Sequence, residues 1–91
     1  DTTKMSIASE PLVISIDELG EYYINLGEEQ LPISLMELKN KAKIIFQANP
    51  DIEIVFKSDA NVPFDFVAKG MASIQSLGIE KVGIITSGYD S

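Results

Sequence analysis

The sequence contains no cysteine, no histidine, no tryptophan and no arginine. Without cysteine and histidine, none of the usual zinc ligand sets can be assembled. The same absences exclude a serine or cysteine nucleophile that an imidazole base activates. These common kinds of catalytic and metal site are therefore excluded, whereas the missing cysteine leaves the cellular compartment open.

Positive charge is also scarce, with seven lysines against 14 acidic residues and a net charge of −7. Nucleic-acid binders engage phosphates through clustered lysine and arginine, so this balance argues against nucleic acid as a partner. An anionic membrane surface is disfavoured as a direct ligand for the same reason. The cluster Lys39, Lys41 and Lys43 is most simply a solvated helix face.

Long apolar runs are missing as well, because no stretch of about 20 apolar residues occurs of the kind that spans a bilayer. The remaining composition, 45% apolar and 23% charged, is that of an ordinary globular domain. We expect residues 1–11, which are weakly patterned, to form a flexible linker. Residues 12–91 are expected to form one domain.

Residues 52–87 predict a strand, a helix and a second, parallel strand. Apolar and polar residues alternate over 52–57, and residues 81–86 are rich in valine and isoleucine. Pro63 suits the first position of the helix, and Gly78 can end it in the left-handed conformation. Such a strand–helix–strand unit is right-handed in nearly all proteins.

The first half of the chain predicts a β-hairpin and another helix. Residues 12–16 and 22–26 alternate in the manner of strands around a turn that ends at Gly20. Ser34 and Glu37 form a capping-box sequence in front of an apolar helical stripe. The order ββαβαβ predicts an α+β fold, a two-layer sandwich of a mixed four-stranded sheet with two helices on one face.

The second face of that sheet is expected to carry apolar side chains from all four strands, namely Val13, Tyr23, Val55 and Ile85. This set is too apolar for comfortable exposure on a monomer, so we expect this face, our candidate self-association face, or a sheet edge to pair with a partner. In the alternative interpretation, the N-terminal segment folds over this face.

Three residues of the second helix carry further expectations. Gly70 on the buried side indicates a close approach of the helix to the sheet, because glycine inside a helix costs about 1 kcal/mol relative to alanine. Phe64 is expected at the edge of the core. Phe66 is expected to point aside and to be the better candidate for an exposed anchor.

The loops that follow the parallel strands open on the same edge of the sheet, where ligands of open α/β sheets usually bind. Asp59 lies in one of these loops and Ser87 in the other. A small ligand-binding or catalytic α/β domain built on these two residues is one hypothesis. The simpler interpretation is that Asp59 organises the turn, because a lone aspartate is a weak metal signal and no glycine-rich phosphate loop is present. We predict no enzyme, no cofactor and no metal.

Several short motifs follow one another in order along the second half of the chain: QANP, Asp59, VPFD, SLGI and KVGIIT. This ordered set resembles the ExbD/TolR family of single-span inner-membrane proteins, and its TolR-like members more closely than its ExbD-like members. The resemblance covers residues 12–87, through pattern alone in the first half. Phe64 departs from it, since tyrosine is common there in the family.

The resemblance implies a periplasmic domain attached to an N-terminal transmembrane helix that is not in this sequence. It implies a role in the proton-driven Tol–Pal system, which maintains outer-membrane integrity and assists cell division, with TolQ-like and TolA-like membrane proteins as partners. Dimerisation and peptidoglycan binding are further implications. The alternative is an ExbD-like subunit that energises TonB-dependent transport.

An acidic domain that contacts peptidoglycan or a partner must do so mainly through hydrogen bonds and stacking. Side-chain type alone nominates the following candidates for these contacts: Tyr22, Tyr23, Asn25, Asp59, Asn61 and Phe66.

Overall fold

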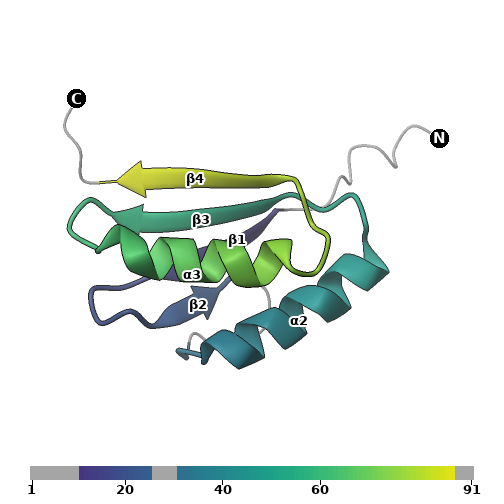
Figure 1. Ribbon diagram of the computed structural model, residues 1–91, viewed down its shortest axis with the longest axis horizontal. Helices are drawn as coiled ribbons and strands as arrows, with labels where there is room; N and C mark the ends of the chain where they lie inside the picture. Colours follow the sequence, from purple (N-terminus) through teal and green to yellow (C-terminus); the bar gives the residue numbers. More distant parts are fainter. Residues whose placement is uncertain (1–10, 26–30, 88–91) are drawn as a thin grey trace.

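The structure is a computed structural model that describes residues 11–25 and 31–87 (Figure 1). The elements follow the order ββαβαβ, which confirms the predicted α+β class. Their bounds are β1 Leu12–Ile16, β2 Tyr22–Ile24, α2 Leu35–Ala48, β3 Ile54–Asp59, α3 Phe64–Gln75 and β4 Val82–Ser87.

The four strands form one mixed sheet in the order β2-β1-β3-β4. The hairpin partners β1 and β2 are antiparallel, whereas β1 and β3 are parallel, as are β3 and β4. Both helices lie in front of the sheet in Figure 1, as the sequence predicts. The central strands are therefore β1 and β3, and the edges are β2 and β4.

The core lies between the helices and the sheet, because every second strand residue points to the helices. In the register, Ile14 lies between Ile24 and Phe56, and both Ile14 and Phe56 are fully buried. Leu38 of α2 and Ile74 of α3 close this layer from the other side. The apolar stripes expected from the sequence therefore do face the sheet.

The capping box starts α2 as predicted. The backbone N–H of Glu37 donates to Ser34 Oγ at 3.1 Å, and the N–H of Ser34 donates to Glu37 Oε1 at 3.4 Å. At the other end, the N–H of Asn49 donates to the carbonyl of Ile45, and Pro50 follows. Both ends are therefore set by local side-chain and backbone chemistry.

The second helix, α3, approaches the sheet as closely as its glycine indicates. A Cβ placed on Gly70 would lie 2.7 Å from Cε2 of Phe56 and 3.1 Å from Cε2 of Tyr22. Gly78 has a φ of +89°, in the left-handed region, as predicted. One boundary differs, because Pro63 has an extended ψ of 134° and precedes the helix instead of opening it.

The second strand is shorter than predicted. It ends at Ile24, and the side chain of Asn25 accepts a hydrogen bond from the N–H of Val13 at 2.8 Å and donates to the carbonyl of Pro11 at 3.2 Å. The side-chain amide of Asn25 thus accepts from a backbone N–H of β1 that could otherwise donate to a neighbouring strand. Leu26, the linker up to residue 10 and the chain after Ser87 lie outside the described residues.

Candidate functional site

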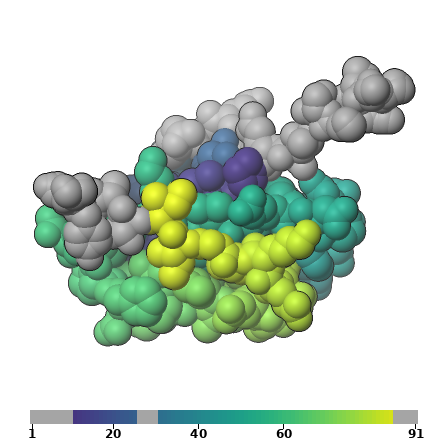
Figure 2. All heavy atoms as spheres, turned by 90° about the horizontal axis from the view of Figure 1, so that it is seen from above, coloured from purple at the N-terminus to yellow at the C-terminus, as the bar shows by residue number. Residues whose placement is uncertain are grey.

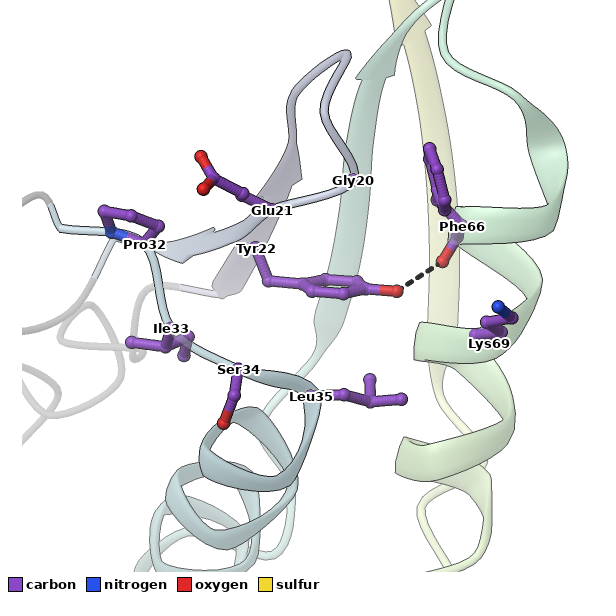
Figure 3. Close-up of a pocket in the computed structure, with 9 residues that line it drawn as sticks. All are labelled: Gly20, Glu21, Tyr22, Pro32, Ile33, Ser34, Leu35, Phe66 and Lys69. Carbon is purple, nitrogen blue, oxygen red and sulfur yellow. Dashed lines mark hydrogen bonds between the residues drawn. The ribbon is translucent and has the colours of Figure 1, made fainter.

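Tyr22 and Tyr23 are neighbours on β2 and point to opposite faces of the sheet. Tyr22 is only 6% exposed, and its hydroxyl donates a 2.7 Å hydrogen bond to the carbonyl of Phe66 (Figure 3). Burial raises the pKa of the Tyr22 phenol. Tyr22 therefore ties β2 to α3 from inside the core, and its hydroxyl is engaged within the fold.

The ring of Tyr22 borders a hollow where β2, the start of α2 and α3 meet (Figure 3). This hollow, the Tyr22 hollow, has a volume of ≈ 490 Å³. It is lined by Gly20, Glu21, Tyr22, Pro32, Ile33, Ser34, Leu35, Phe66 and Lys69. Its walls are mostly apolar, with one carboxylate and one ammonium group. Such a hollow can receive an apolar side chain with a polar end, but it holds no nucleophile paired with a base.

The expectation for the two phenylalanines of α3 is wrong. Phe66 is half-buried, whereas Phe64 is 63% exposed. The reason lies in the β1–β2 turn: Gly20 has a φ of +82°, and a Cβ there would be 2.9 Å from Cζ of Phe66. Since glycine leaves this space, the Phe66 ring packs against the turn. Its predicted contact role stays a prediction.

A cluster of polar side chains lies at the carboxyl end of β1. The Tyr23 hydroxyl donates to Asp17 Oδ2 at 2.9 Å and to Glu21 Oε1 at 3.2 Å. Asp17 Oδ1 accepts from the N–H groups of Glu21 and Leu19 at 2.9 and 3.0 Å. The Glu21 N–H is the main cause that lowers the pKa of Asp17. The hydrogen bond to Asp17 is the main cause that raises the pKa of Tyr23 to about 12.

This cluster borders a small cleft of ≈ 220 Å³, the carboxyl-end cleft. It is lined by Ser15, Ile16, Asp17, Tyr23, Lys57, Ser58 and Asp59. The cleft thus brings together two of the predicted residues, Tyr23 and Asp59. Asp59 also pairs in register with Ser87 of β4, at the edge of the sheet that the sequence indicates. Over residues 11–25 and 31–87, no group of three or more potential metal ligands occurs.

The remaining predicted contacts lie at opposite ends of the sheet. The Asn25 amide is bonded beside the amino end of β1, whereas Asn61 is exposed in the turn after the carboxyl end of β3. Because β1 and β3 are parallel, these two residues cannot belong to one small site. The six candidates are therefore divided among the Tyr22 hollow, the carboxyl-end cleft, the hairpin and the turn between β3 and α3.

The four residues of the candidate self-association face do share the side of the sheet opposite the helices, here called the far face. Val13 pairs with Val55, and Lys57, which pairs with Ile85, lies on the same side. Val13, Tyr23 and Val55 are half-buried, and Ile85 is 53% exposed. The far face is therefore apolar at these four residues, but Ser15, Lys57 and Asp59 alternate onto the same side and add polar and charged groups to it.

The far face ends at an open strand edge. Figure 2 looks onto β4, whose yellow atoms run across the front of the view with α3 beneath them. In the part of the chain that the structure describes, β4 pairs only with β3, and its residues carry no charge. An edge strand of this kind presents unpaired N–H and C=O groups to another chain.

Neither described helix has the length and apolarity that crossing a bilayer requires.

Comparison with known proteins gives a consistent set of relatives. A sequence model of the family described as "Biopolymer transport protein ExbD/TolR" matches residues 1–88. The biopolymer transport protein ExbD of Pseudomonas aeruginosa is 33% identical over 81 residues, covering 86% of this chain and 56% of its own length. The ExbD of Neisseria gonorrhoeae is 27% identical over 77 residues, covering 85% of this chain and 53% of its own length.

The Tol-Pal system protein TolR of Escherichia coli K12 is 22% identical over 77 residues, covering 84% of this chain and 54% of its own length. The chain thus spans about half the length of the curated relatives that it matches.

Proposed function

This chain belongs to the ExbD/TolR family, and from that premise we propose that it is the periplasmic domain of an inner-membrane protein that helps to couple proton flow to work at the cell envelope. The observation that carries the proposal is the family match over residues 1–88. The domain acts by changing its contacts with other molecules and performs no chemical transformation. Residues 1–11 serve as the linker to a membrane anchor, and residues 12–91 form the periplasmic domain.

Two versions of this role are proposed, and they differ in the system served. The ordered motifs of the second half favour a TolR-like subunit that acts in the Tol–Pal system with TolQ-like and TolA-like partners. The identities of 33% and 27% to proteins named ExbD, against 22% to TolR, favour an ExbD-like subunit of biopolymer transport. Purifying the full-length protein from its own cells and identifying the membrane protein that accompanies it decides between them. A TolQ-like companion supports the first version, and the corresponding subunit of the ExbD system supports the second.

Self-association through the far face is the first contact that we propose. The apolar residues of this face and the uncharged edge of β4 support it. Ile85→Lys places a second ammonium group beside Lys57, its partner in the register, and is expected to convert a dimer into a monomer. Sedimentation across a range of concentrations measures this change.

Leu19→Lys is the matched control, because Leu19 is also exposed and lies in the β1–β2 turn. It is expected to leave the dimer intact. A wild-type chain that sediments as a monomer at every concentration contradicts the proposal, as does a dimer that Ile85→Lys leaves unchanged.

Peptidoglycan binding is the second proposed contact, with Asp59 at the end of β3 and Asn61 in the β3–α3 turn as exposed predicted residues. A pulldown with isolated cell wall tests it through Asn61→Ala, with Asn40→Ala on α2, which is also exposed, as the control. Reduced retention of Asn61→Ala alone supports the site. Equal retention of both variants removes Asn61 from it, and no retention of the wild-type chain removes the activity. Phe66→Ala in the same assay tests the half-buried candidate.

A further inference from the structure

A groove that no prediction anticipated runs between the two helices. It has a volume of ≈ 740 Å³ where α2 contacts α3, and we call it the helix groove. It is lined by Leu35, Met36, Lys39, Asn40, Lys43, Ser73, Ser76 and Leu77. Leu35 also lines the Tyr22 hollow, and in Figure 3 it projects from the start of α2 towards α3.

The charge of the helix groove is opposite to that of the chain. The chain carries 14 acidic residues, yet none of them lines the groove, whereas two of the seven lysines do. Lys39 and Lys43 are four residues apart and therefore lie above one another on one side of α2. Lys41 points elsewhere, since it shares the outer side of the helix with Glu37. The lysine cluster of the sequence is thus divided, and two of its members act together.

The bottom and rim of the groove offer apolar contacts. Met36 is 74% exposed, and Leu35 and Leu77 are half-buried although they lie against the core. An exposed methionine adapts its shape to different apolar partners, which is why it recurs at protein-binding surfaces. An apolar strip beside a pair of cations is the complement of an amphipathic helix with acidic flanks.

We propose that the helix groove is the docking site for an acidic amphipathic helix of a partner protein. The apolar stripe of that helix rests on Met36 and Leu77, and two carboxylates one turn apart lie opposite Lys39 and Lys43. A third helix laid along two packed helices also follows the usual ridges-into-grooves packing. This site is separate from the far face, which lies on the other side of the sheet.

Other occupants fit the charges less well. A second copy of this chain offers α2, with three lysines and one glutamate, or α3, with one lysine and one aspartate. Neither helix is acidic, so neither complements the groove. An anionic lipid surface attracts clusters of several lysines or arginines and repels a chain with a net charge of −7. Nucleic acid requires more phosphate contacts than two lysines supply.

The test uses the 91-residue chain and two designed peptides of equal length and equal apolar pattern. One peptide has Leu at successive helical contact positions with Glu on both flanks, and the other has Lys in place of Glu. Each peptide is titrated into the isotope-labelled chain, and the amide NMR signals are followed. Only the Glu peptide is expected to shift the amide signals of the helix-groove residues. Added salt is expected to weaken this binding.

Paired variants assign the binding to the groove. The double variant Lys39→Gln, Lys43→Gln is expected to lower the affinity for the Glu peptide by about fivefold to tenfold, because exposed ion pairs contribute modestly to binding. Lys41→Gln, on the outer side of the same helix, is expected to leave the affinity unchanged. Met36→Ala is expected to weaken binding, whereas Ile44→Ala, 65% exposed on α2 outside the groove, is not.

Several results overturn the proposal. The first three are no amide shifts with the Glu peptide, shifts confined to residues outside the groove, and binding of the Lys peptide as tight as that of the Glu peptide. The fourth is an equal loss of affinity in a groove variant and in its control on the same helix. Vesicles that contain anionic phospholipid are titrated in parallel. If they shift the groove residues and the Glu peptide does not, the site belongs to a lipid surface instead of a protein.

Discussion

The two faces of the sheet are built from the same strands, yet they differ in what covers them. On the helix side, Ile14 and Phe56 are fully buried, whereas their immediate neighbours Val13 and Val55 are half-buried on the far face. Because strand residues alternate, one strand supplies both surfaces at once. An apolar strand residue therefore stabilises this domain most where the chain's own helices bury it completely.

If that is so, truncation must cost far more on one face than on the other. Phe56→Ala is expected to lower the free energy of unfolding by about 3–5 kcal/mol, because a fully buried ring is replaced by a cavity. Val55→Ala, one residue away on the far face, is expected to cost about 1 kcal/mol, because its methyl groups are only half-buried. Urea unfolding followed by circular dichroism measures both.

The loss from Phe56→Ala is a large part of the total stability expected for a domain of this size, which is about 5–10 kcal/mol. Equal losses from the two variants, measured under conditions where the chain is monomeric, contradict the comparison. If Val55→Ala costs more at high protein concentration than at low concentration, the far face is buried by a second chain.

Two glycines allow the two faces to be compared by adding a methyl group to each instead of removing side-chain atoms. Gly70→Ala is expected to lower the free energy of unfolding by about 1–2 kcal/mol, although alanine favours helix, because the new Cβ overlaps the Phe56 ring. Gly83→Ala adds a Cβ on the far face, where nothing lies within 4 Å. It is expected to change stability by less than about 0.5 kcal/mol. Thermal unfolding of both variants against the wild-type chain measures the difference, and a stabilised Gly70→Ala variant contradicts the close approach.

Local chemistry accounts for the parts of the fold that could be predicted. Three such features are the Ser34 capping box, the left-handed Gly78 and the glycine at position 70. Each can be recognised from a nearby residue or from the helical periodicity of a single element. The shared far face also follows from alternation alone, once each strand is recognised. These features need no knowledge of how the elements pack.

The features that the sequence predicted wrongly or did not predict depend on packing between elements. Whether Phe64 or Phe66 is exposed depends on which side of α3 meets the β1–β2 turn, and helical periodicity does not give that. The bond from the Tyr22 hydroxyl to the Phe66 carbonyl joins residues 44 positions apart. The helix groove exists only because α2 lies beside α3. Candidate contacts chosen by side-chain type were therefore scattered over the molecule.

The smallest expected effect concerns two adjacent tyrosines that belong to opposite faces. Both have raised pKa values, but burial is the cause for Tyr22, and the hydrogen bond to Asp17 is the main cause for Tyr23. The pKa of Tyr23 rises from 10.0 to about 12, so between these values the folded chain holds a proton that the unfolded chain has lost. The contribution of Tyr23 to stability is therefore complete below pH 10 and is lost as the pH rises towards 12.

Tyr23→Phe is expected to remove this part of the alkaline loss of stability, which urea unfolding at a series of alkaline pH values measures against the wild-type chain. Asp17→Asn separates the two causes, because it keeps an oxygen that can accept from the turn and removes the charge that holds the phenol proton. The absorbance of ionised tyrosine is then expected to show Tyr23 titrating at lower pH in this variant. If Tyr23 titrates at the same pH in the variant and in the wild-type chain, the hydrogen bond to Asp17 is not the main cause of its raised pKa.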